Sequence, residues 1–260
     1  MVLHFCSRRR PVSDKVLLVT GGSRGIGAAT ARLAAAQGWA VAVNYSANSL
    51  AADEVVRAIR ASGGTAMAVQ ANVADEAQVL RMFEHIDAKF GRLTGLVNNA
   101  GVVDRGQPVA EHSVARWRRM FDINVIGSLL CAREAVRRMG TAYGGTGGSI
   151  VNLSSAAARL GSPNEYVDYA AAKAAIDAFT IGLAKEVAPQ GIRVNAVRPG
   201  LIDTEIHASG GRPNRVEELK QHVPMGRGGT ADEVAEVIVW LLSEAASYTT
   251  MSLIDVSGAR

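Results

Sequence analysis

The two residues best suited to chemistry in this sequence are Tyr169 and Lys173, which lie in the run YAAAKAA. Because alanine is the strongest helix former, this run predicts a helix, and the i, i+4 spacing places both side chains on one face of it. A phenol has an ordinary pKa of about 10, and a nearby ammonium group lowers it by stabilising the phenolate. Tyr169 is therefore a candidate general acid or base, although the same pair also occurs on ordinary exposed helices.

The rest of the chain alternates short apolar runs with amphipathic ones. The apolar runs predict buried parallel strands, which cover residues 15–20, 39–45, 65–73, 93–101, 149–155, 192–200 and 251–257. Helical periodicity predicts helices at 28–37, 49–62, 75–90, 111–139 with a break near 122–124, a helix through Tyr169 to about Val187, and 231–244. This order indicates an α/β fold, a parallel sheet with right-handed crossovers in one domain.

Length and composition agree with one domain. A chain of 260 residues with 48% hydrophobic content can bury a large core. No apolar run reaches the roughly 18 residues that a membrane helix needs, so we expect no membrane partner. We interpret residues 1–13 as a disordered or loosely attached extension, and residues 14–260 as the domain. The apolar part of the extension precedes its arginines, the reverse of a secretory signal, which favours the cytoplasm.

Charge and metal-binding residue types exclude further partners. The formal net charge is +4, but a basic stripe with interleaved aromatic residues, which is typical of nucleic-acid binding, is missing from the sequence. The five histidines show no ligand-like spacing, and Cys6 lies far from Cys131 in the chain. We therefore expect no nucleic acid, no metal site and no disulfide framework.

A glycine-rich turn, TGGSRGIG at 20–27, joins the first strand to the first helix. The backbone N–H groups and dipole at a helix N-terminus attract phosphate, and glycines allow both the tight turn and close approach of a pyrophosphate. A plain strand-to-helix turn has a similar composition, but the position after the first strand favours a dinucleotide site. The expected contacts are Gly21, Ser23, Gly25, Ile26 and Gly27.

The second strand ends in Asn44, Tyr45 and Ser46, where an acidic residue would bind an adenine ribose and disfavour a 2′-phosphate. No acid is present there. Arg24, in the glycine-rich turn, could instead pair with a 2′-phosphate, unless it is simply exposed at the helix start. The sequence thus favours NADP over NAD, with these four residues near the adenosine.

From about residue 14 to the C-terminus the chain resembles the short-chain dehydrogenase/reductase family. The matching motifs are TGGSRGIG at 20–27, NNAG at 98–101, Asn124 in NVIG, Ser155 after IVNLS, YAAAK at 169–173 and PGLIDT at 199–204. Each motif is modest, but their number and order are specific. The resemblance implies a Rossmann fold with a seven-stranded parallel sheet flanked by helices on both faces, and a nicotinamide cofactor.

The resemblance also implies residue roles. Tyr169 would be the general acid or base, Lys173 would lower its pKa and hold the nicotinamide ribose, and Ser155 would bind the substrate oxygen, with Ser154 as a competing candidate. Asn124 would keep a water in a proton relay through the helix backbone. The remaining cofactor contacts that it implies are Asn72, Val73, Asn99, Ala100, Gly101, Pro199, Gly200, Ile202 and Thr204, together with Tyr169 and Lys173.

We therefore expect an NADP(H)-preferring oxidoreductase that interconverts a secondary alcohol and a carbonyl, with a sugar-dehydrogenase-like or 3-oxoacyl-reductase-like substrate. The alternative is a dinucleotide-sensing Rossmann protein without turnover. Relatives in the family imply a homotetramer or homodimer. Residues 201–229 contain five glycines and two prolines without a clear period and could cover the site as a lid. Within them, His207 could face the substrate or solvent, and we favour solvent.

Overall fold

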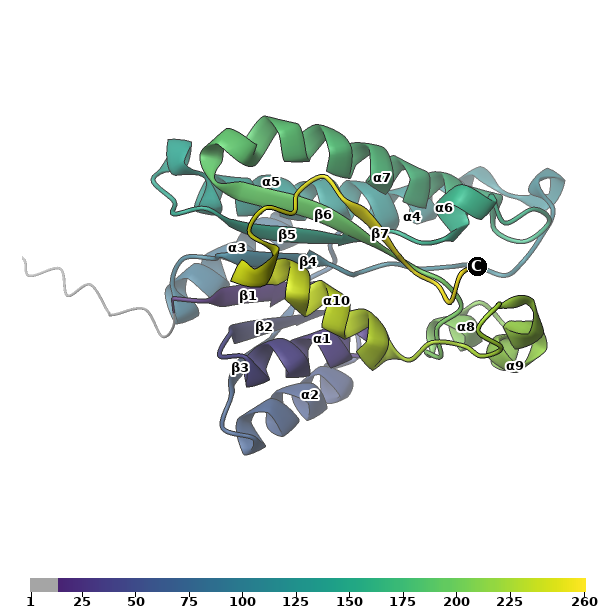
Figure 1. The fold of residues 1–260 in the computed structure, drawn as a ribbon, viewed down its shortest axis with the longest axis horizontal. Helices are drawn as coiled ribbons and strands as arrows, with labels where there is room; N and C mark the ends of the chain where they lie inside the picture. Colours follow the sequence, from purple (N-terminus) through teal and green to yellow (C-terminus); the bar gives the residue numbers. More distant parts are fainter. Residues whose placement is uncertain (1–13) are drawn as a thin grey trace, which may run out of the picture.

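Seven strands form one parallel sheet in the order β3-β2-β1-β4-β5-β6-β7 in the computed structural model, which describes residues 14–260 (Figure 1). The expected N-terminal extension, residues 1–13, lies outside the described residues. The strands are β1 (Val16–Val19), β2 (Ala40–Tyr45), β3 (Thr65–Gln70), β4 (Gly95–Asn98), β5 (Gly148–Leu153), β6 (Ile192–Pro199) and β7 (Leu253–Val256). The predicted seven-stranded Rossmann-like fold is confirmed.

Helices cover both faces of this sheet (Figure 1). The α-helices are α1 (Gly25–Ala36), α2 (Ser49–Ala61), α3 (Glu76–Phe90), α4 (Val114–Phe121), α5 (Gly127–Met139), α6 (Ala157–Leu160), α7 (Val167–Val187), α8 (Ile206–Ser209), α9 (Arg215–Leu219) and α10 (Ala231–Leu242). Short 3-10 helices span Val109–Glu111, Thr141–Tyr143, Ala188–Gln190, Lys220–His222 and Glu244–Ala246. Within residues 14–260, none of the helices is both long enough and apolar enough to span a membrane.

Strand β1 shows why its sequence is apolar throughout. Leu17 and Val19 point into the core that α1, α2 and α10 cover, whereas Val16 and Leu18 point into the core beneath α3, α5 and α7. All four side chains are fully buried. A parallel strand with helices on both faces has no solvent side, so the alternation of polar and apolar residues disappears.

Three segments differ from the sequence-based expectation. The break near 122–124 is a π-helical segment, Asp122–Ile126, between α4 and α5. The stretch from 201 to 229 contains α8 and α9, and α6 follows β5; none of these three helices was predicted. Helices of four or five residues are about one turn long, so they cannot show the repeating apolar face from which a helix is recognised.

The strand order positions the site. Strands β2 and β3 extend from one side of β1, and β4 to β7 extend from the other, so the chain reverses direction across the sheet between β1 and β4. Loops that follow neighbouring strands diverge at such a point, and ligands of open α/β sheets bind in the resulting crevice at the carboxyl ends of the strands. The glycine-rich turn follows β1, NNAG follows β4 and Ser155 follows β5.

Candidate active site

The helix α7 places Tyr169 and Lys173 on the same face, as the spacing predicts. Lys173 is buried, and its Nζ donates a hydrogen bond to the backbone oxygen of Leu153 at 2.6 Å. The same Nζ lies 5.6 Å from the centroid of the Tyr169 ring. The hydrogen bond to the end of β5 therefore positions the ammonium group of Lys173 over the face of the Tyr169 ring.

The net pKa of Tyr169 differs in direction from the expectation, because it is raised and not lowered. Burial raises the pKa of Tyr169 to about 12, and only a hydrogen bond with Ser155 acts in the opposite direction. Burial likewise lowers the pKa of Lys173 to about 8, opposed by the carboxylate of Asp177. For both groups, burial of the charged form is the largest cause of the pKa shift. This direction favours a protonated Tyr169 phenol near neutral pH.

The two candidate serines occupy different environments. Ser154 is buried, and its hydroxyl donates to the backbone oxygen of Lys173 at 3.1 Å. Ser155 is half-buried, accepts a hydrogen bond from the backbone N–H of Ala157 at 3.1 Å, and interacts with Tyr169. Because a hydroxyl that accepts still has its own proton to donate, Ser155 can bind a substrate oxygen. Ser154 instead ties β5 to α7.

Asn124 lies in the π-helical segment and is completely buried. Its side chain forms two hydrogen bonds with the backbone of Val102, accepting from N at 3.1 Å and donating to O at 3.0 Å. Gly101 lies beside it, and a β-carbon there would be 2.7 Å from Oδ1 of Asn124 and 3.6 Å from Nζ of Lys173. The amide side chain therefore fixes the loop after β4, and the glycine leaves room between Asn124 and Lys173.

The glycine-rich turn has the geometry that a dinucleotide requires. Arg24 is the N-cap of α1 with extended backbone and no side-chain cap, so the first N–H groups of the helix are left for a ligand. Gly25 has φ +49°, and a β-carbon on it would lie 3.2 Å from Cγ2 of Thr204. The turn and the loop after β6 thus approach each other across a gap that a side chain would fill, and the residues present fit a nicotinamide dinucleotide.

Asn44 does not face this gap, contrary to the expectation. It is 2% exposed, and its Oδ1 accepts from the N–H of Gly21 at 3.1 Å. Its Nδ2 donates to the backbone oxygens of Val69 and Ala71 at 3.3 and 3.0 Å. The amide therefore supports the turn from inside the protein. It satisfies backbone groups at the ends of β1 and β3 instead of facing a ligand.

Asn99 and Ala100 also pack beneath the turn. Asn99 donates from Nδ2 to the backbone oxygens of Thr20 and Gly21, both at 2.9 Å. A β-carbon on Gly21 would come within 2.9 Å of Cα of Ala100, so the loops after β1 and β4 are in direct contact. Asn99 also lines the cavity described below, whereas Ala100 supports the turn.

The other residues expected near the adenosine lie at the ends of β2 and β3. Tyr45 is partly buried against the core, and Ser46 is exposed. Asn72 is exposed with its Oδ1 accepting from the N–H of Ala74 at 3.1 Å, and Val73 is buried. Arg24 is exposed, and within residues 14–260 it makes no ion pair, so its guanidinium group is free for an anion.

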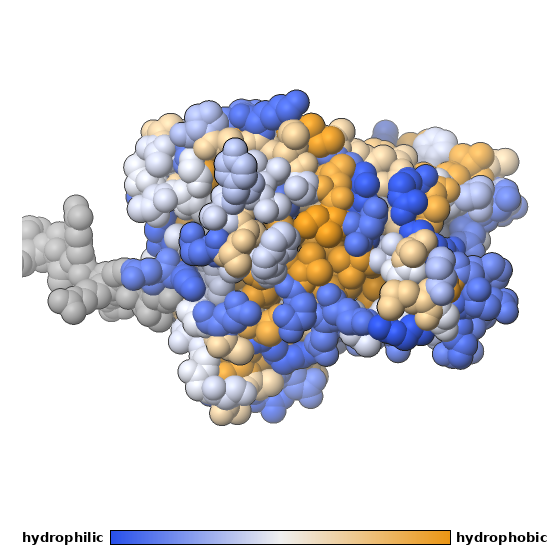
Figure 2. Space-filling model, in the orientation of Figure 1, coloured by the Kyte–Doolittle hydropathy of each residue, from blue (hydrophilic) through white to orange (hydrophobic). Residues whose placement is uncertain are grey.

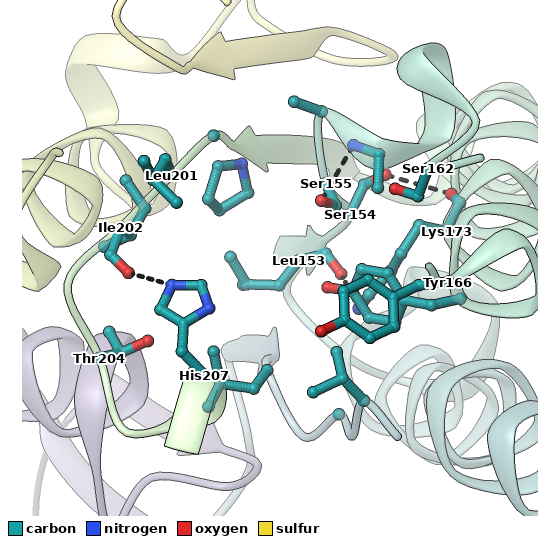
Figure 3. Close-up of a pocket in the computed structure, with 18 of the residues that line it drawn as sticks. Leu153, Ser154, Ser155, Ser162, Tyr166, Lys173, Leu201, Ile202, Thr204 and His207 are labelled. Carbon is teal, nitrogen blue, oxygen red and sulfur yellow. Dashed lines mark hydrogen bonds between the residues drawn. The ribbon is translucent and has the colours of Figure 1, made fainter. Parts of the chain in front are cut away.

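One cavity brings most of the predicted catalytic residues together (Figure 3). Ser155 and Lys173 lie on one side of it, and Ile202 and Thr204 lie on the other. Tyr169 also lines it. The remaining expected cofactor contacts on its wall are Ile26, Asn99, Gly101, Pro199 and Gly200. Gly21, Ser23, Arg24, Gly25 and Gly27 belong to the adjoining turn.

The structure adds wall residues that the sequence did not identify. His207 lines the cavity, which corrects the expectation that it faces solvent, and its Nε2 lies 2.8 Å from the backbone oxygen of Ile202. Tyr166, Arg215 and Leu160 line the cavity as well. Tyr166 is the N-cap of α7 with non-helical backbone, so helical spacing in the sequence could not place it beside Tyr169.

The site can be compared with known proteins. Residues 21–258 match the family model described as enoyl-(acyl carrier protein) reductase. The chain is 56% identical over 245 residues to the uncharacterized oxidoreductase YgfF of Escherichia coli, covering 94% of this chain and 99% of the relative. It is 41% identical to cis-4-hydroxycyclohexanecarboxylate dehydrogenase of Sinomonas cyclohexanicum, covering 95% of this chain and 96% of the relative.

Two further similarities agree. The 3-oxoacyl-[acyl-carrier-protein] reductase of Synechocystis is 40% identical, with 95% of this chain and 97% of the relative covered. The structure of a mutant short-chain dehydrogenase/reductase from Serratia marcescens has a TM-score of 0.87 at 34% identity, covering 96% of this chain and 99% of that one. The chain is therefore an NAD(P)-dependent oxidoreductase that belongs to the short-chain dehydrogenase/reductase family.

Proposed function

We propose that the domain formed by residues 14–260 is an NADP(H)-preferring oxidoreductase that interconverts a secondary alcohol and a carbonyl, with Tyr169 as its general acid and base. The observation that carries the proposal is the meeting of Ser155, Tyr169 and Lys173 in one cavity beside Thr204, at the carboxyl edge of the sheet. A protein that only sensed a dinucleotide would have no use for a phenol, a hydroxyl group and an ammonium group converging there.

In the reductive direction, the chain's own groups act on the carbonyl oxygen. Ser155 donates a hydrogen bond to that oxygen, and Tyr169 donates its proton to it as the alcohol forms. The raised pKa of Tyr169, about 12, keeps the phenol protonated at neutral pH, which is the form that a general acid requires. The bound nicotinamide supplies the hydride to the carbonyl carbon.

Lys173 acts once the proton has left. Its ammonium group, 5.6 Å from the ring centroid, stabilises the negative charge that develops on Tyr169. Gly101 leaves the space between Asn124 and Lys173 free of a side chain, and we propose that water held there by Asn124 returns the proton to the tyrosine. In the oxidative direction the same groups work in reverse, with Tyr169 as the general base.

The cofactor is proposed to bind along the carboxyl edge of the sheet. The first turn of α1 would hold the pyrophosphate through its free N–H groups, and Thr204 and Lys173 would hold the nicotinamide half. Arg24 supports the preference for NADP, because it is exposed and lacks a carboxylate partner within the described residues. No carboxylate occupies the end of β2, where Tyr45 and Ser46 lie.

The carbonyl reduction is tested by Tyr169→Phe. A panel of ketones, aldehydes, sugars and 3-oxoacyl esters is assayed with NADPH and NADH for the wild type and the variant. Because positioned acid or base groups contribute roughly 10²- to 10⁴-fold, the variant should lose at least 100-fold in kcat/KM while its NADPH affinity changes little. A wild type that binds NADPH but turns over no carbonyl would favour the dinucleotide-sensing alternative instead.

The cofactor preference is tested by Arg24→Ala. A charge-assisted hydrogen bond to phosphate is worth about 1.5 to 3 kcal/mol, so the Kd for NADPH should rise roughly 10- to 100-fold while that for NADH stays nearly constant. Arg32→Ala is the matched control, since Arg32 is exposed on the same helix but lies two turns further along it. Equal losses for both cofactors would refute the phosphate contact.

We also propose a cytoplasmic homotetramer or homodimer. Figure 2 shows an apolar patch in the middle of one face, over the region where α10, β6 and β7 lie in Figure 1. Trp240 and Met251, two large apolar residues of this region, are 41% and 42% exposed. Exposed apolar side chains of this size favour contact with a second chain. Light scattering coupled to size-exclusion chromatography measures the assembly, and a monomer would contradict it.

A further inference from the structure

His207 projects from α8 into the cavity, on the side opposite Tyr166 (Figure 3). Its Nε2 lies 2.8 Å from the backbone oxygen of Ile202. A carbonyl oxygen can only accept a hydrogen bond, so Nε2 must be the protonated nitrogen. The other ring nitrogen, Nδ1, has no hydrogen-bond partner among the described residues, and in Figure 3 it faces the open space of the cavity.

The surroundings keep this imidazole neutral. Burial lowers the pKa of His207 below its ordinary value, and the guanidinium groups of Arg215 and Arg212 lower it further. The hydrogen bond to Ile202 and the carboxylate of Asp203 act in the opposite direction without reversing it. With Nε2 protonated and the ring neutral, Nδ1 presents a lone pair to the cavity. That nitrogen can only accept a hydrogen bond from whatever binds there.

Tyr166 offers the complementary group. It is buried, Arg215 stacks over its ring at 5.0 Å, and Nη1 of Arg215 donates a hydrogen bond to its hydroxyl oxygen at 3.3 Å. Because the guanidinium group has no lone pair to accept with, this bond leaves the phenol proton of Tyr166 unused. Tyr166 therefore presents a donor to the same cavity in which His207 presents an acceptor.

We infer that the substrate carries a hydroxyl group beyond its reacting carbonyl, and that His207 accepts a hydrogen bond from this hydroxyl while Tyr166 donates one to it. A hydroxyl is a group that can do both. Apolar side chains, among them Val103, Leu160 and Ile206, line the cavity together with the charged residues Arg215 and Arg260. The substrate class is therefore a hydroxylated ketone whose skeleton packs against the apolar part of this wall. His207 is a specificity-determining residue in this inference, which rests on the proposed function.

Matched substrates isolate the hydroxyl proton. Cyclohexanones with a hydroxyl group at ring position 2, 3 or 4 are compared with their methoxy counterparts, which keep the oxygen but cannot donate. For at least one ring position, wild-type kcat/KM with NADPH should favour the hydroxyl compound about tenfold, the effect of one hydrogen bond of about 1.4 kcal/mol. The ratio should fall to near one in His207→Leu and stay higher in His207→Asn, whose amide oxygen lies near the position of Nδ1.

Ala208→Gln is the control variant, because Ala208 is exposed on the same helix. Its ratio of kcat/KM for the hydroxyl compound to that for the methoxy compound should equal the ratio of the wild type. NMR of protein labelled with nitrogen-15 in its histidines gives a second readout. The Nδ1 resonance that is missing in His207→Leu should show an unprotonated nitrogen and should move when the preferred hydroxyl compound is added, but not its methoxy counterpart.

The two proposals fail in different ways. If the wild type and His207→Leu turn over ketones with the same ratio of kcat/KM for hydroxyl and methoxy compounds, the role of His207 is overturned and the oxidoreductase remains. The same holds if this ratio is no higher in His207→Asn than in His207→Leu. A protonated Nδ1 would overturn it as well. Absence of turnover on every ketone by the wild type would overturn the proposed function and this inference with it.

Discussion

Replacing Lys173 with methionine should stabilise the protein while removing its activity. The lysine is 4% exposed, and burial lowers its pKa from 10.5 to about 8. A buried ammonium group that prefers to lose its proton opposes folding at neutral pH, where it must stay charged. Methionine has a similar length and carries no charge, so the variant avoids this penalty.

The size and the pH window follow from the two pKa values. One pKa unit corresponds to 1.36 kcal/mol, so the charged Lys173 lowers the free energy of unfolding by roughly 3 kcal/mol below pH 8. Between pH 8 and 10.5 the unfolded chain binds more protons at this residue than the folded chain, so wild-type stability rises with pH there through Lys173. Loss of the hydrogen bond to Leu153 offsets the gain in the variant by about 1 to 2 kcal/mol at every pH.

Urea unfolding of the wild type and Lys173→Met at one protein concentration, from pH 7 to pH 10, tests this reasoning. We expect the variant to be more stable at pH 7 by about 1 to 2 kcal/mol, and its advantage over the wild type to shrink by roughly 3 kcal/mol as the pH rises. Lys185→Met is the control, since Lys185 is exposed on the same helix, and it should show no such change. A stability difference that stays constant with pH would refute the burial argument.

Three further substitutions test the packing around the site. A β-carbon in Gly27→Ala would lie 2.5 Å from Nδ2 of Asn99, so the turn must shift, and calorimetry should show weaker NADPH binding and a lower Tm. Nε of the buried Arg116 lies 2.7 Å from the carboxylate of Asp168 in the wild type, and Asp168→Asn removes this charge partner. Urea unfolding should show that the free energy of unfolding falls by about 3 to 5 kcal/mol. Thr230→Ala removes the capping box of α10, which should cost about 1 kcal/mol in the same assay.

The sheet could be predicted from sequence because its strands are buried on both faces. Each strand has a short apolar run bounded by turn residues, and most are followed by a helical period, so the number of strands and their alternation with helices along the chain were readable. The order of the strands within the sheet was not predicted. The long helix with Tyr169 ends at Val187, as Pro189 and Gly191 indicated. The segment 201–229 gave no such signal, because α8 and α9 are about one turn each and reach the cavity through only Ile206, His207 and Arg215.

The identities of the site residues were more predictable than their electrostatics. The i, i+4 spacing placed Tyr169 and Lys173 on one face of a helix, the family resemblance added Ser155, and all three line one cavity. The pKa of Tyr169 depends instead on how much water surrounds the phenol, which no local pattern records. His207 is a similar case: its side chain enters the cavity because Ile202, five residues earlier, turns its carbonyl oxygen toward it.

Asn44 and Asn99 show that asparagines expected beside the cofactor also support the backbone of the site. Asn44 and Asn99 both belong to segments beside the cofactor region, yet both amides bind backbone groups of the turn that follows β1. Loops at the end of a sheet carry N–H and C=O groups that no neighbouring strand pairs, and a buried amide can satisfy one of each. Because the turn is already rigid, a phosphate can bind the first N–H groups of α1 without ordering further backbone. The glycines and the asparagines thus have different roles. The glycines leave room for a dinucleotide, and the asparagines fix the backbone around that room.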